Sequence, residues 1–175
     1  FFTPALVNTG HPSAPLLFSY LYLLLAGFII VIRQRDWWLL AIPTVLGAFL
    51  WAAVWRFAGL YAPGDSLWVG LFLLASCATV VAANHRAVAE QADHAPVLAF
   101  GKRALTLQYG TMGGALVLLS LLTGKAAFTD LEWGLFGLLS GGGIALAFFN
   151  QALYGLVPWL ALVANGLLLL VWQTD

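Results

Sequence analysis

Residues 16–32 read LLFSYLYLLLAGFIIVI, a run without a charged side chain, and this feature constrains the fold most strongly. A membrane-spanning α-helix needs about 20 mostly apolar residues, because each residue advances the helix by about 1.5 Å. Further stretches of similar length and composition follow along the chain. The chain is therefore predicted to fold as an all-α, polytopic bundle of transmembrane helices. Its six predicted spans are residues 16–32, 38–55, 67–83, 104–122, 131–149 and 152–172.

The composition indicates a bilayer rather than water as the surrounding solvent. Hydrophobic residues make up 62% of the 175 residues and charged residues only 8%, whereas soluble domains carry about 25% charged residues. The sequence lacks a period-two alternation of polar and apolar residues, and open sheet edges are not tolerated in hydrocarbon, so strands are not expected. The lipid bilayer is the first expected partner.

Charge and cysteine content exclude several classes of function. The formal net charge is zero, whereas a nucleic-acid-binding protein should carry a basic patch. Cys77 is the only cysteine, so the chain forms neither an intrachain disulfide nor a cysteine-based metal cluster. We expect Cys77 to be a small apolar filler, and we expect no cofactor, no metal and no nucleic-acid partner.

The segments between the spans indicate one transmembrane domain over residues 1–175. The apolar stretch 1–7 begins without Met and is predicted to be the end of an upstream helix, which makes the chain a fragment of a larger helical array. Residues 84–103 are predicted to be a cytoplasmic loop that is helical in its first half and interrupted by Pro96. The sequence TDLE at 129–132 predicts a capping box at the start of the fifth span.

The distribution of lysine and arginine predicts the orientation. Five of these residues fall on the side that carries the first, third and fifth loops, and two fall on the opposite side. Cytoplasmic loops are enriched in lysine and arginine, which places the first side in the cytoplasm and both ends of the chain in the periplasm of a bacterial inner membrane. The five are Arg33, Arg35, Arg86, Lys102 and Arg103, and the two are Arg56 and Lys125.

Four motifs near the start of the chain, PALVNTG, LFSYLYLLLAG, RQRDWWLLA and LGAFLW, resemble a family of very large polytopic bacterial membrane proteins. That family is a domain of unknown function, described only as predicted membrane protein. The resemblance is strongest over the first third of the chain. It implies a longer parent protein whose remaining helices are partners, and it implies no catalytic or binding residues. The matching residues are Pro4, Thr9, Gly10, Phe18, Tyr20, Gly27, Arg35, Trp37, Gly47, Phe49 and Trp51.

The predicted spans and the long loop contain few polar side chains that are candidates for a catalytic or binding site. The central turns of the spans contain no ionisable group, which argues against a proton relay or cation site made by this chain alone. Asn165, near the middle of the last span, is predicted either to bond a neighbouring helix or to line a polar cavity. His85, Glu90 and His94 in the long loop are weak candidates for a metal or acid–base site, with a solvated cytoplasmic helix as the favoured alternative.

Small residues form stripes at helical spacing in the fourth and fifth spans. Such faces allow two helix backbones to approach closely, so we interpret them as helix-packing positions, with a hinge at the SGGG sequence of residues 140–143 as the alternative. The predicted packing positions are Thr106, Gly110 and Gly114 in the fourth span, and Gly134, Gly137 and Gly141 in the fifth.

These observations favour a transport-type or scaffolding component of the bacterial cell envelope over an enzyme. The chain offers much surface for helix packing and contains no recognised catalytic motif. A membrane-embedded transferase that acts on a lipid-linked sugar or acyl group is one alternative, and a purely structural helix-packing module is another. The transferase needs a carboxylate or histidine at the outer interface, for which the candidates are Asp65, Asp130, Glu132 and His11. Asp65 or Ser66 is also expected to cap the third span.

Overall fold

In the computed structural model, the described residues are 13–35, 38–92, 103–125, 129–149 and 151–174. They are helical apart from short connecting segments, and no strand occurs among them. The predicted all-α bundle is thereby confirmed. The elements in chain order are α2 (Ala14–Arg35), α3 (Trp38–Phe57), the 3₁₀ helix η1 (Pro63–Asp65), α4 (Ser66–Ala92), α5 (Arg103–Lys125), α6 (Asp130–Phe149), α7 (Gln151–Tyr154) and α8 (Val157–Thr174).

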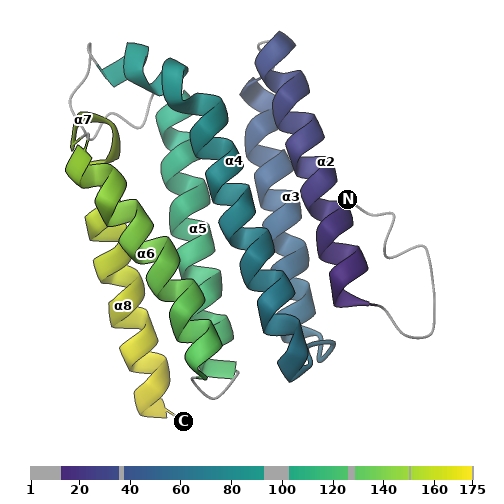
Figure 1. Ribbon diagram of the computed structural model, residues 1–175. Coiled ribbons are helices and arrows are strands. Elements are labelled where there is room, and N and C mark those ends of the chain that lie inside the picture. Colours follow the sequence, from purple (N-terminus) through teal and green to yellow (C-terminus); the bar gives the residue numbers. More distant parts are fainter. Residues whose placement is uncertain (1–12, 36–37, 93–102, 126–128, 150, 175) are drawn as a thin grey trace.

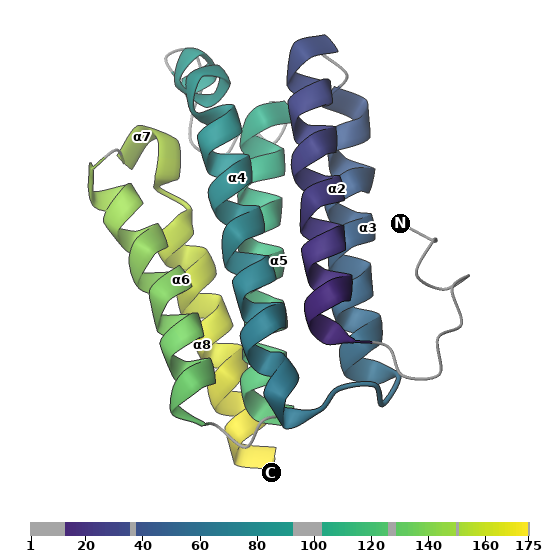
Figure 2. The same ribbon diagram turned by 45° about the vertical axis from the view of Figure 1, so that its right-hand side comes forward.

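The long helices form two layers of three (Figure 1, Figure 2). One layer contains α6, α4 and α2, and the other contains α8, α5 and α3. Helix α5 lies at the centre, where it packs against α3, α4, α6 and α8. Helix α2 begins at the end of the bundle where α8 ends, and this end also carries η1. We call it the η1 end, and we call the opposite one the α7 end.

Helix α2 shows how sequence spacing produces the packing. Its buried side chains recur every three or four residues, which places them on one face of a helix. Phe18, in that face, packs edge-on against Trp55 of α3 with 5.7 Å between ring centroids, and lies 5.4 Å from the ring of Phe72 in α4. The buried face consists of Ala14, Phe18, Leu21, Leu25, Ile29 and Ile32.

Large apolar side chains cover the outside of the bundle. Leu23 of α2, Leu46 of α3 and Leu138 of α6 are 69%, 63% and 65% exposed. Helices α2 to α6 are all long and apolar enough to cross a membrane. Soluble monomers rarely expose such contiguous apolar surface. The protein is therefore membrane-embedded.

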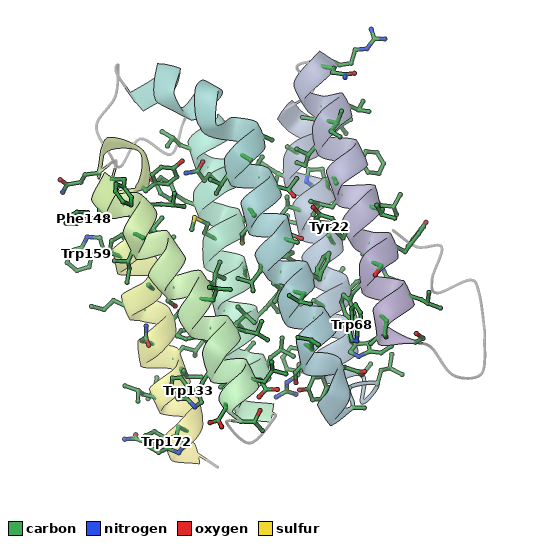
Figure 3. The ribbon with its side chains drawn as sticks, in the orientation of Figure 1. Tyr22, Trp68, Trp133, Phe148, Trp159 and Trp172 are labelled. Atoms are coloured by element: carbon green, nitrogen blue, oxygen red, sulfur yellow. The ribbon has the colours of Figure 1, made fainter. Side chains whose placement is uncertain are left out.

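Exposed aromatic side chains lie toward both ends of the bundle. Trp68, Trp133 and Trp172 lie near the η1 end, whereas Phe148 and Trp159 lie toward the α7 end (Figure 3). Tryptophan is enriched at the two membrane–water interfaces because its ring is apolar and its N–H is polar. The aromatic side chains therefore agree with a bundle whose long axis crosses the bilayer.

The last predicted span, residues 152–172, is divided in the structure. Residues Gln151–Tyr154 form the short helix α7, and α8 follows after a turn, so its apolar stretch Val157–Leu170 is shorter than in the other helices. Pro158 explains the division, because it has no N–H to bond the carbonyl oxygen of Tyr154 and it fits the first turn of a new helix.

Helix α4 is longer than its predicted span of residues 67–83. It continues to Ala92, so the first part of the predicted cytoplasmic loop at 84–103 is helical. The rest of that loop, residues 93–102, lies outside the described residues.

Candidate functional site

Asp65 is the centre of a polar cluster at the η1 end. Its Oδ2 accepts a hydrogen bond from Nε1 of Trp55 at 2.9 Å and another from the backbone N–H of Ala62 at 3.0 Å. Trp55, in the last turns of α3, is only 2% exposed. Asp65 therefore ties the end of α3 to the turn that begins α4, which gives this predicted candidate a structural use.

Tyr61 lies beside Asp65 in the link between α3 and η1. Its hydroxyl shares a hydrogen bond with Oγ of Ser66, whose side chain is 1% exposed. Burial raises the pKa of Tyr61 above its ordinary value of 10.0, and the bond with Ser66 lowers it in part. The charges of Glu132 and Asp65 raise this pKa further, whereas Arg56 lowers it. Tyr61 is therefore a neutral phenol at physiological pH.

Arg56 connects two helices at the same end of the bundle. Its Nε donates to the carbonyl oxygen of Leu121 in α5 at 3.2 Å. Its guanidinium also lies over the ring of Phe57, 5.3 Å from the centroid, in a cation–π arrangement. Arg56 thus holds the end of α3 against the end of α5.

Glu132 contributes a buried carboxylate at the start of α6, where it is 3% exposed. The hydroxyl of Thr129 donates to this carboxylate, and the N–H of Trp133 donates to the carbonyl oxygen of Thr129 at 3.2 Å. The two residues of the predicted capping box therefore bond each other through their side chains. Their bond fixes the first turn of α6.

These groups place a guanidinium, a phenol and two carboxylates at one end of the bundle. Such a set is chemically able to contact a polar lipid headgroup or to move a proton. In this structure, however, Asp65, Arg56 and Glu132 each bond a backbone group or a neighbouring side chain of the fold. The arrangement fastens the end of α3 to η1 and to the end of α5, and it fixes the first turn of α6.

The predicted packing stripe of α6 meets no neighbour among the described residues. Gly134, Gly137 and Gly141 are exposed, and a Cβ added at any of them would meet no atom within 4 Å. The reason is the rotation of α6, which turns its larger side chains, such as Phe136 and Leu139, toward the core. The stripe therefore lies on the outer face of the bundle, and its predicted role in helix packing stays a prediction, because no described helix covers it.

The predicted stripe of α5 is divided. A Cβ at Gly114 would lie 3.1 Å from Cδ2 of Phe49, so Gly114 admits this ring of α3. Gly110 is exposed with open space around it among the described residues, so its packing role stays a prediction, and Thr106 is half-buried.

Two other glycines make the closest approaches between helices. A Cβ at Gly70 of α4 would lie 2.4 Å from Cδ1 of Leu135, and one at Gly143 of α6 would lie 2.6 Å from Cγ1 of Val157. Sequence spacing contains a signal for Gly143, because it follows the buried residues Phe136 and Leu139 at helical intervals.

Asn165 faces outward from α8. The side chain is exposed, and its Nδ2 donates to the carbonyl oxygen of Ala161, four residues earlier in the same helix, at 2.8 Å. The predicted bond to a neighbouring helix is therefore replaced by a bond within α8. The buried face of this helix consists of Val157, Ala161, Ala164 and Leu168.

The predicted metal or acid–base candidates of the long loop cannot be compared with the structure. His94 lies outside the described residues, as do the side chains of His85 and Glu90.

Gln108 and Ser140 are buried polar residues that the sequence reasoning missed. Gln108 of α5 is 0% exposed and Ser140 of α6 is 7% exposed. Neither side chain has a hydrogen-bond partner for its buried polar atoms within the described part of the chain. Gln108 carries the same sequence signal as Asn165, because each is a single amide within a predicted span.

Comparisons of this chain with family models, with curated proteins and with solved structures find no match.

Proposed function

We propose that this chain is a scaffolding module within a larger polytopic protein of the bacterial inner membrane, where it supports other helices of a cell-envelope component. The exposed glycine face of α6, defined by Gly134, Gly137 and Gly141, carries this proposal. The polar cluster at the η1 end supports it as well, because Asp65 and Arg56 hold the end of α3 to η1 and to α5, and Glu132 bonds Thr129 at the start of α6.

Exposed glycine is unfavourable in a lipid-facing helix. Glycine within a helix costs about 1 kcal/mol relative to alanine, and it offers little side-chain surface to lipid. Membrane helices instead use glycine where a second helix approaches closely. The face formed by Gly134, Gly137 and Gly141 meets no neighbour among the described helices. The glycine face is thus suited to contact with a helix from outside the bundle.

The expected occupant is a transmembrane helix of the same larger protein, from outside these 175 residues. The side chains that flank the glycine face are apolar, since Leu138 is 65% exposed and Ile144 is 47% exposed. An apolar partner helix in the bilayer is complementary to this surface, whereas a soluble partner is not. The resemblance to very large polytopic membrane proteins is consistent with such additional helices.

The proposed orientation places the η1 end in the periplasm. Arg56 and Lys125 lie in the last turns of α3 and α5 at that end, whereas the other five lysine and arginine residues fall on the opposite side of the predicted topology. The positive-inside rule then puts the α7 end in the cytoplasm.

Cross-linking in native membranes tests the occupant of the glycine face. The variant Gly141→Cys, in a Cys77→Ser background, should form a disulfide under mild oxidation with a cysteine introduced into another helix of the parent protein. Adding Gly137→Leu should abolish this cross-link, because the larger side chain displaces the partner helix. In the isolated chain, the same Gly137→Leu change should leave the free energy of unfolding unchanged or raise it by up to about 1 kcal/mol.

Ile30→Cys is the matched control, because Ile30 is 57% exposed on α2, at the other end of the same layer (Figure 2). It should form no cross-link to that helix. A homodimer linked through Gly141→Cys would show that a second copy of this chain covers the glycine face, and it would contradict the proposed occupant. If Gly137→Leu lowers the stability of the isolated chain, the glycine face already packs against other residues of this chain. That result would remove the basis of the proposal.

A further inference from the structure

Asn165 of α8 places an amide in an apolar part of the outer surface. It lies within the apolar stretch Val157–Leu170, and its neighbours on that face include Leu162 and Leu169, which are 63% and 52% exposed. One N–H of its Nδ2 donates to the carbonyl oxygen of Ala161. The second N–H and the amide oxygen have no hydrogen-bond partner in the part of the chain that the structure describes. Because no water replaces such a partner in hydrocarbon, these groups are expected to bond another helix.

Asn165 lies on the side of α8 that is closer to α6 than to α5. Two contacts of α8 give these directions. Leu160 approaches α5, where a Cβ at Gly113 would lie 3.5 Å from its Cδ2, and Val157 approaches α6 at Gly143. A helix turns by about 100° per residue, so Leu160 and Asn165 are rotated from Val157 in opposite senses, by about 60° and about 80°. Asn165 is therefore at the α6 edge of the outer surface of α8.

The glycine face of α6 borders the same contact from the other side. Helices α6 and α8 are antiparallel neighbours, and Gly143 meets Val157 (Figure 1). Asn165 lies about 12 Å from Val157 toward the η1 end, and Gly137 lies about 9 Å from Gly143 in the same direction. Gly137 is rotated from Gly143 by about 120°, in the sense opposite to Leu135, which contacts α4. Gly137 and Asn165 therefore flank the contact between α6 and α8 at similar depth.

We propose that the helix covering the glycine face also covers Asn165 and bonds its amide through an uncharged side chain, an amide or a hydroxyl. This inference rests on the proposed scaffolding function and specifies the chemistry of the partner helix. A helix with its side chains is about 10 Å wide, so a single helix reaches both Gly137 and Asn165. The amide of Asn165 offers a donor and an acceptor, and asparagine, glutamine, serine and threonine side chains offer both in return. An ionised side chain is instead costly in hydrocarbon.

Cysteine pairing in the complete parent protein tests this inference. Asn165→Cys, in a Cys77→Ser background, is combined with single cysteines along the helix that cross-links to Gly141→Cys. The position that forms a disulfide fastest should carry asparagine, glutamine, serine or threonine in the native sequence. A double-mutant cycle then joins Asn165→Ala with alanine at that position. Chemical denaturation in mixed micelles should show a coupling of about threefold in the unfolding equilibrium constant, the usual strength of such a bond in a membrane.

Val163→Ala is the matched control, because Val163 is 65% exposed on the side of α8 turned away from α6, and it should show no coupling to the same position. If Asn165→Cys does not fold, Leu169→Cys, one turn further along the same face, replaces it in the scan.

An apolar residue opposite Asn165, or a cycle without coupling, would overturn the inference and leave the scaffolding function intact, because the Gly141→Cys cross-link still forms. A disulfide between two copies through Asn165→Cys would also overturn it. If no helix of the parent protein cross-links to Gly141→Cys, the scaffolding function fails, and the inference fails with it.

Discussion

Replacing Gly143 with alanine should lower the free energy of unfolding by about 1–3 kcal/mol, the usual effect of adding a methyl group to a filled core. The new Cβ would lie 2.6 Å from Cγ1 of Val157. Val157 is 0% exposed, and its β-branched side chain has one strongly preferred rotamer in a helix, so it has no room to turn aside. Thermal unfolding in detergent, followed by circular dichroism, measures the loss.

Gly142 provides the matched control for this change. It is the preceding residue, it is exposed, and a Cβ there would meet nothing within 4 Å. Gly142→Ala should therefore be neutral or stabilising by up to about 1 kcal/mol. Adding Val157→Ala to Gly143→Ala should restore part of the lost stability, because it makes room for the methyl group. Equal unfolding temperatures for the Gly142 and Gly143 variants would contradict the packing of α6 against α8.

Removing the carboxylate of Asp65 should destabilise the protein by about 1–3 kcal/mol, the cost of a buried donor without an acceptor. Asp65→Ala leaves Nε1 of Trp55 without its partner, and this indole is 2% exposed. The backbone N–H of Ala62 also loses a bond, but Ala62 is exposed and water replaces the carboxylate there. The unfolding temperature, followed by circular dichroism in detergent, measures the effect.

A double-mutant cycle separates this bond from a general effect of charge. Asp65→Ala should cost less in a Trp55→Phe background, where no indole N–H needs an acceptor. Asp130→Ala makes the same charge change at an exposed position of the η1 end and should cost less than Asp65→Ala. If Asp65→Ala and Asp130→Ala are equally mild, Asp65 does not hold α3 and η1 together.

The helical bundle is predictable from sequence because its determinant is local. Each long run without charge has to satisfy its own backbone hydrogen bonds in hydrocarbon, and an α-helix does so within the run. The predicted segments therefore coincide with α2 to α6 apart from a few residues at the ends and the extension of α4 to Ala92. The division before α8 depends on one residue, Pro158, whose effect on a helix is decided by its position in the first turn.

The direction in which each helix face points is not local, and the sequence pattern alone does not predict it. The glycines of α6 and those at helix contacts have the same local pattern, so spacing alone does not tell whether a stripe meets this chain, a partner or lipid. Asn165 and Gln108 show the same limit. Both are single amides in apolar helices, yet the rotation of α8 turns one outward and the packing around α5 buries the other completely. Only the contacts of the assembled bundle separate them.

The apolar outer surface is expected to face lipid, and cysteine labelling with a water-soluble maleimide tests this expectation most directly. Single cysteines replace Leu46, Gly64 and Gln34 in turn in a Cys77→Ser background; all three positions are exposed on the protein surface. In intact cells, Gly64→Cys at the η1 end should be labelled, Gln34→Cys should be labelled only after the membrane is permeabilised, and Leu46→Cys should remain unlabelled in both conditions. Labelling of Leu46→Cys as fast as that of Gly64→Cys, with the protein still folded, would show water at the middle of α3 and would contradict its placement in the bilayer.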